Sequence, residues 1–290
     1  MTRVRIGFLT RSFKPESRSS VPPLMRALSD AGAHVEVVHP IAGATDLSRM
    51  RLEHDLYVLK QMSGLAVSLA GALHAQGAAI VNPYPVTLAL SDKVVAFRIL
   101  ERAGAPMPES YVFSQPDDLA PLLEAGPLIV KPIRGSDGHG VRLISRAGDL
   151  AELPRGKEPV FAQRYIRPQG TTELKMFVIG DQVFGVKRRV RLEIKDGGDG
   201  EPFTPTPELR AIVLRCGEAF GIDLYGVDVI ERDGQAFLVD MNSVPGFKGV
   251  PDGTLRVARY LYAAAERVAR GKPLFEWAVP REPAWTAGSP

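Results

Sequence analysis

The sequence predicts an α/β fold that begins with a parallel sheet and continues into strand-rich α+β structure. In the first 90 residues, apolar strands alternate with helix-like segments, which is the pattern of a parallel sheet with helices packed on it. From residue 91 onward this rhythm changes, and short strands outnumber helices. The hydrophobic content of 45% and the charged content of 24% are typical of a soluble globular protein.

The elements of the N-terminal part follow from apolar runs and from the residues that begin and end helices. Proline near the start and Gly32 at the end mark the first helix. We expect strands at residues 4–10, 34–40, 55–60 and 78–83, and helices at 20–32 and 64–77.

The later part begins with a helix at residues 91–104, opened by Ser91 or Asp92 and closed by Gly104. Residues 173–194 form two strands joined at Gly180-Asp181. We expect further strands around Tyr111, Ile129, Val141 and Val160, a loop at 195–205, a helix at 207–220, a hairpin at 225–246, a last helix at 252–270 and a proline-rich tail from 272.

Composition excludes several classes of protein. The single cysteine, Cys216, rules out a disulfide framework and suits a reducing cytoplasm. No apolar run approaches the twenty residues of a membrane-spanning helix, and the N-terminus is too short and strand-like for a signal peptide. The net charge of +3 is mild and no basic stripe stands out, so we expect a cleft for a small anionic substrate and no nucleic-acid partner.

The segment "IVKPIRGSDGHGVRLI", residues 129–144, predicts a loop between two strands. Lys131 stands at the exit of the first strand, and Gly135, Gly138 and Gly140 follow it. Such a loop can lay backbone N–H groups over a phosphate chain, with the lysine at its mouth. The alternative is an ordinary hairpin with a flexible tip.

The hairpin at 225–246 carries a candidate metal site. Asp240 and Asn242 are two apart on a strand, so they share one face, and Asp228 lies on the strand before. Mg²⁺ accepts such oxygen ligands, whereas the alternative is that the acids face solvent. A two-residue turn at Asp233-Gly234 would place the acids on opposite faces, so a shared site requires an odd-numbered loop or a bulge.

Taken together, these motifs resemble the ATP-grasp superfamily over about residues 3–270. "VKPIRGSDGHGV" is similar to its nucleotide loop and "DMNSVPGFKG" to its metal segment. "FAQRYI" is similar to its hinge, although Arg164 stands where the family has glutamate. The resemblance implies an ATP-grasp fold in which two α+β lobes clamp ATP: an N-terminal α/β domain at 1–90, a central lobe at 91–165, a C-terminal lobe at 166–274 and a tail at 275–290.

The resemblance also implies roles for individual residues. Lys93 and Lys131 would hold the ATP phosphates, and Glu173 would bind the ribose hydroxyls. The phosphate-covering loop and the adenine hinge would be formed by Gly135, Ser136, Gly138, Gly140, Gln163, Tyr165 and Ile166.

For the chemistry, the resemblance implies one or two Mg²⁺ ions, with Mn²⁺ as an alternative, held by Asp228, Asp240 and Asn242. The cations that would project toward the γ-phosphate or the acceptor are Lys175, Arg188 and Arg189. Lys60 and the loop after the first strand are further candidates for an anionic acceptor, since both lie where open sheets bind ligands. Residues 195–201 are expected to be a mobile lid.

Three activities fit this resemblance. The N-terminal third and the glycine loop resemble RimK-type ligases, which activate a carboxylate as an acyl phosphate and join it to an amine, amino acid or peptide. "LKMFVIGD" and "PGFKGVPD" also resemble inositol-phosphate kinases of the same fold. A non-catalytic ATP-binding module is the third alternative, against which the complete metal set argues. The ligase is our first hypothesis, acting in the cytoplasm on a small-molecule or peptide acceptor, with a homo-oligomer as one assembly common among relatives.

Overall fold

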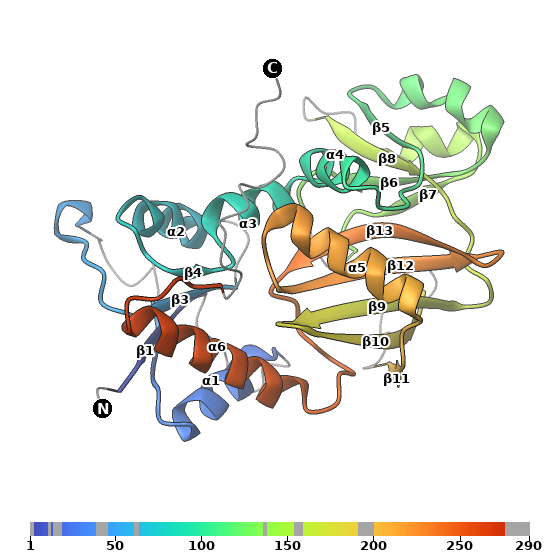
Figure 1. The fold of residues 1–290 in the computed structure, drawn as a ribbon. Helices are drawn as coiled ribbons and strands as arrows, with labels where there is room; N and C mark the ends of the chain where they lie inside the picture. Colours follow the sequence, from blue (N-terminus) through green and yellow to red (C-terminus); the bar gives the residue numbers. More distant parts are fainter. Residues whose placement is uncertain are drawn as a thin grey trace, which may run out of the picture.

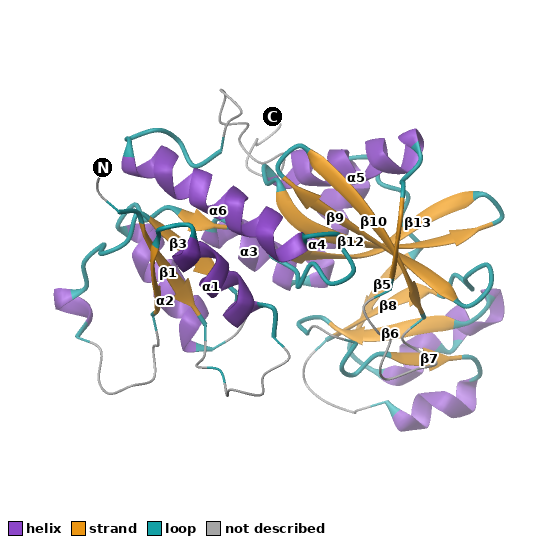
Figure 2. Cartoon of the chain, turned by 90° about the horizontal axis from the view of Figure 1, so that it is seen from below, coloured by secondary structure: helices purple, strands orange, loops and turns teal. Residues whose placement is uncertain are grey.

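The computed structural model describes residues 3–10, 13, 19–38, 46–60, 64–135, 138–153, 159–190 and 200–275. Within these residues the strands form three sheets, and the N-terminal sheet lies to one side of the other two (Figure 1). The view from below in Figure 2 shows the same separation, with helix α3 between the N-terminal sheet and the rest. None of the helices described combines the length and apolar character needed to cross a membrane.

The N-terminal sheet is parallel, as predicted. Its order is β2-β1-β3-β4, and every neighbouring pair is parallel. Helix α2 (Leu65–Ala75) packs Ala70 and Leu73 against this sheet, while α1 (Val21–Asp30) uses Leu24 and Leu28. The strands are β1 (Arg5–Leu9), β2 (His34–Val37), β3 (Leu56–Leu59) and β4 (Ile80–Val81).

Two consecutive helices connect this sheet to the rest of the chain. Helix α4 (Lys93–Arg102) begins where predicted, because the Asp92 carboxylate accepts from the N–H groups of Val94 and Val95. Helix α3 (Tyr84–Ser91) was not predicted. Its apolar side chains are distributed around the helix and give no clear amphipathic stripe, so only packing on its neighbours reveals it.

The central sheet is antiparallel and has the order β5-β8-β6-β7. Short 3₁₀ helices at Pro116–Leu119, Pro121–Ala125 and Ala147–Glu152 contribute Leu119 and Leu150 to its core. The strands are β5 (Ser110–Phe113), β6 (Leu128–Pro132), β7 (Arg142–Ile144) and β8 (Val160–Arg164), in agreement with the expected positions.

The C-terminal sheet is also antiparallel, in the order β11-β10-β9-β12-β13. Its edge strand β11 (Glu201–Phe203) corrects the prediction of a loop through 195–205, while residues 191–199 lie outside the described part of the chain. The strand forms because Gly185 leaves room for the Phe203 ring, which a Cβ there would approach to 2.5 Å. The other strands are β9 (Thr172–Ile179), β10 (Gln182–Arg189), β12 (Leu224–Arg232) and β13 (Gln235–Ser243).

The two faces of the C-terminal sheet bury different partners. One face packs Met176 and Val227 against helix α5 (Pro207–Phe220). The other face packs Phe177 and Ile179 into the core of the N-terminal sheet, together with α1 and α6 (Gly253–Ala269). The last helix of the expected C-terminal lobe therefore shares a core with the first strands of the chain.

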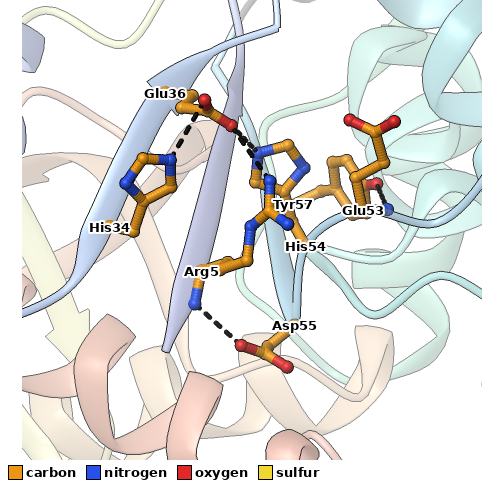
Figure 3. Close-up of polar contacts among 7 residues, drawn as sticks. All are labelled: Arg5, His34, Glu36, Glu53, His54, Asp55 and Tyr57. Atoms are coloured by element: carbon orange, nitrogen blue, oxygen red, sulfur yellow. Dashed lines mark hydrogen bonds and ion pairs between the residues drawn. The ribbon is translucent and has the colours of Figure 1, made fainter. Parts of the chain in front are cut away.

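A polar cluster lies on β1, β2 and the segment just before β3 of the N-terminal sheet (Figure 3). The carboxylate of Glu36 lies 3.0 Å from His34 Nε2 and 2.8 Å from His54 Nε2. These hydrogen bonds lower the pKa of Glu36, and Arg5 is a further cation 3.6 Å from it. His34 and His54 are twenty residues apart in sequence, so nothing in their spacing predicted that they share a partner.

Cys216 lies in α5 with no exposed surface, and burial raises the pKa of its thiol to about 12. Because the thiolate is the reactive species, we expect Cys216 in the native protein to resist alkylation at pH 8 and to react fully after unfolding in guanidinium. Labelling with iodoacetamide, followed by mass spectrometry, measures this. Rapid labelling of the native protein would contradict the buried position.

Candidate active site

The predicted acids lie in one row across three strands of the C-terminal sheet. Asp228 on β12 pairs with Lys175 on β9 on one side and with Asp240 on β13 on the other. Paired residues of an antiparallel sheet point to the same face. The three side chains therefore lie side by side on the face that is turned away from α5.

The register that brings the acids together depends on a bulge. The turn at Asp233-Gly234 has only two residues, yet Asp228 pairs with Asp240 and Val229 pairs with Leu238. Val239 is the extra residue in β13, and it returns the strand to the register that the shared site needs. Of the two alternatives that the sequence allowed, an odd-numbered loop or a bulge, the bulge is the one present.

Contacts of the carboxylates leave a set of oxygen donors suited to a hard divalent cation. Lys175 Nζ lies 2.5 Å from Asp228 Oδ1, and Asn242 Nδ2 donates weakly to Asp228 Oδ2 at 3.4 Å. The N–H of Met241 donates to Asp240 Oδ1 at 3.1 Å. Two carboxylates and an amide fit Mg²⁺, which completes its shell with phosphates and water. In the described residues, no group of three or more His, Cys, Asp or Glu could hold a metal by itself.

Lys131 faces this row from the central sheet. Its Nζ donates to Gln163 Oε1 at 2.7 Å and to the carbonyl of Val239, the bulge residue, at 3.0 Å. Although its place at the mouth of the loop suggests an open position, only 9% of the surface of Lys131 is exposed between the two sheets. Burial lowers the pKa of Lys131, and the nearby carboxylate of Asp240 opposes that effect.

Lys93 and the glycine loop adjoin this position. Lys93 is the first residue of α4, and its Nζ donates to the Gly135 carbonyl at 2.9 Å. Gly140 has φ +74°, and a Cβ there would lie 2.8 Å from Pro132 Cγ, so the loop requires glycine at that position. Gly138 also has positive φ, whereas Ser136 lies outside the described residues.

Arg164, which stands where the family has glutamate, points away from Lys131. Its guanidinium donates to the carbonyls of Leu122 and Gly126 on the outer side of the central lobe, and it lies 3.7 Å from Glu109. Adjacent strand residues point to opposite faces, so Gln163 points inward to Lys131. Tyr165 and Ile166 follow the strand, and the Tyr165 N–H donates to Pro127.

The remaining predicted site residues on β9 and β10 do not all share one face of the sheet. Glu173 on β9 pairs with Arg188 on β10, so both are on the face of Lys175. Arg188 also donates to the Lys248 carbonyl at 2.8 Å. Arg189 is exposed and points to the opposite face, so its expected place beside Lys175 is corrected by strand alternation.

The sequence interpretation left the role of Lys60 open and did not include Ser110. Lys60, just after β3, donates to the carbonyl of Val244 in the loop after β13. Ser110 on β5 accepts from Gln163 Nε2 at 3.1 Å. Serine on a short strand carries no distinguishing pattern, so only the sheet pairing identifies its role.

A glycine loop and a buried lysine on one antiparallel lobe, facing a carboxylate row on a second lobe, define an ATP-grasp protein. The RimK-like ATP-grasp domain family matches residues 90–261. The chain therefore belongs to the RimK-like ATP-grasp family.

Individual proteins are similar to this chain in sequence or in fold. A probable alpha-L-glutamate ligase of Alkalilimnicola ehrlichii is 27% identical over 274 residues, which are 85% of this chain and 91% of the relative. A RimK domain ATP-grasp protein of Sphaerobacter thermophilus has a TM-score of 0.70 at 21% identity, over 89% of this chain and 99% of that one. D-alanine–D-alanine ligase of Bacillus anthracis, solved with ATP, has a TM-score of 0.73 at 18% identity, over 92% of this chain and 99% of that one.

Proposed function

We propose that the chain is an ATP-dependent ligase that joins a carboxylate to an amine through an acyl phosphate. The observation that carries this proposal is the convergence of Lys131 from one lobe and the Asp228–Asp240 row from the other. Relatives named as alpha-L-glutamate ligases favour an amino-acid carboxylate or amine among the substrates. Phosphoryl transfer requires charge neutralisation and alignment, which lysines and a divalent cation provide.

The chain's own residues divide the work between two steps. Lys93 and Lys131 hold the phosphates of ATP, while the glycine loop covers them. The acceptor carboxylate attacks the γ-phosphorus, ADP leaves, and the amine then displaces phosphate from the acyl phosphate with loss of a proton. Lys175 and Arg188, on one face of the C-terminal sheet, are placed to neutralise charge on the transferred group. Asp228, Asp240 and Asn242 would hold a divalent cation such as Mg²⁺, which would supply Lewis-acid charge to the phosphates.

The acceptor is expected to be a small anionic molecule or peptide. Lys60 lies just beyond the carboxyl end of β3, close to the loop after β13. A small cavity at this place is lined by Lys60, Ser20 and Thr254 among apolar residues. Open parallel sheets bind ligands at this edge, so the N-terminal domain contributes the acceptor side of the cleft.

Substituting Lys175→Met tests the metal site without nucleotide. Because the ammonium of Lys175 pairs with Asp228, we expect its loss to tighten Mn²⁺ binding about threefold or more while lowering turnover. Electron paramagnetic resonance of free Mn²⁺ measures the affinity. Lys187→Met is the matched control, because Lys187 lies over the Phe203 ring on the opposite face. Unchanged Mn²⁺ affinity in Lys175→Met would remove Asp228 from the metal set.

Substituting Lys131→Met tests the phosphate site. Methionine retains much of the stem but not the ammonium, so we expect ATP turnover to fall about a hundredfold or more. ADP release reports the turnover, and circular dichroism reports the fold. A folded variant with near-normal turnover would show that Lys131 does not act on phosphate.

Oxygen transfer distinguishes the ligase from a kinase. An acceptor is first identified by screening ADP release against amino acids, peptides and polyol phosphates, and its carboxylate is then labelled with ¹⁸O. We expect one labelled oxygen in the phosphate released, because that oxygen bridges the acyl phosphate. Mass spectrometry of the phosphate provides the measurement. A phosphorylated product that resists hydroxylamine, without label transfer, would establish the kinase instead.

A further inference from the structure

Gln163 is the most deeply buried polar side chain of the site, with 2% of its surface exposed. It lies on β8, between β5 and β6 of the central sheet. Its Oε1 accepts from Lys131 Nζ at 2.7 Å, and its Nε2 donates to Ser110 Oγ at 3.1 Å. The side chain is therefore engaged at both ends by groups of the protein.

The orientation of this amide is determined by the chain of hydrogen bonds. Ser110 Oγ donates its only hydrogen to the Pro108 carbonyl at 2.9 Å, so toward Gln163 it can only accept. Nε2 must therefore face Ser110, and Oε1 must face Lys131. The ammonium of Lys131 can only donate, which agrees with this orientation.

Lys131 donates to two neutral acceptors, the Gln163 amide and the Val239 carbonyl. The carboxylates of Asp240 and Asp228 act on Lys131 through space, and Lys93 opposes them. Among the residues that the structure describes, the buried ammonium is thus held in place by dipoles, and no carboxylate is bonded to it directly. A neutral holder leaves that charge available to a ligand anion, whereas a carboxylate in the same place would compete with the anion.

We propose that Gln163 is a positioning residue for ATP binding: its amide, oriented by Ser110, aims Lys131 at the nucleotide phosphates without neutralising it. This inference rests on the proposed role of Lys131 in binding ATP. It gives the Gln163 side chain a task separate from the expected contact of the hinge backbone with adenine.

The isosteric substitution Gln163→Glu tests the proposal. A glutamate forms an ion pair with Lys131, so we expect ATP affinity to fall about tenfold or more, with adenosine affinity unchanged. In steady-state assays the KM for ATP rises more than kcat falls. Isothermal titration with adenosine and with a non-hydrolysable ATP analogue plus Mg²⁺ measures the affinities.

Three further variants isolate the effect. Gln182→Glu is the matched control, because Gln182 Oε1 also accepts from a cation, Arg256 Nη1 at 3.0 Å, on an exposed part of β10. Ser110→Ala frees the amide to turn, and we expect it to lower ATP affinity about threefold. Adding Gln163→Glu to Lys131→Met is expected to cause no further loss, since the group on which it acts is gone.

The outcomes separate the two proposals. A wild-type protein that does not bind the ATP analogue would overturn the proposed function and this inference with it. If the wild type binds, equal ATP affinity in folded Gln163→Glu would overturn the inference alone, as would an equal loss for adenosine and ATP. Should Gln163→Glu fail to fold, unchanged ATP affinity in Ser110→Ala would overturn it.

Discussion

The extra residue in β13, Val239, is the constraint on which the site depends. A regular hairpin with the two-residue turn at Asp233-Gly234 would separate Asp228 and Asp240 onto opposite faces, and the bulge restores them to one face. The same bulge presents the Val239 carbonyl to Lys131 of the central sheet. One backbone irregularity therefore aligns the carboxylates and also links the two lobes.

Burial along β9 explains where the polar row lies. Ile179 and Phe177 are covered by the N-terminal core, whereas Lys175 and Glu173, on the same face of the strand, lie beyond this cover and turn toward the central lobe. The stem of Lys175 crosses Gly226, where a Cβ would lie 3.3 Å from Lys175 Cε. The cost of partly burying the Lys175 charge at the border of this packed face is offset by its ion pair with Asp228.

Much of this arrangement could be predicted from the sequence because local patterns carry it. Alternation along strands predicted the shared face of Asp240 and Asn242, and turn length predicted that a shared site needs either an odd-numbered loop or a bulge. The far-face position of Arg189 follows from the same alternation, and the sequence interpretation overlooked it. The parts that could not be predicted are tertiary: Gln163 as partner of Lys131, and strand β11 formed against Gly185. Each depends on which strands become neighbours, and that information is absent from a local window.

The packing of α6 against α1 bears on how the chain is made. During synthesis β1 leaves the ribosome well before α6, yet α6 supplies Val257 and Leu261 to the same core. Until then Phe8 and Leu28 lack part of their apolar cover, so the N-terminal sheet cannot complete its core ahead of the rest. A segment made early is thus completed by one made much later, and we expect deletion of α6 to expose part of the core around β1.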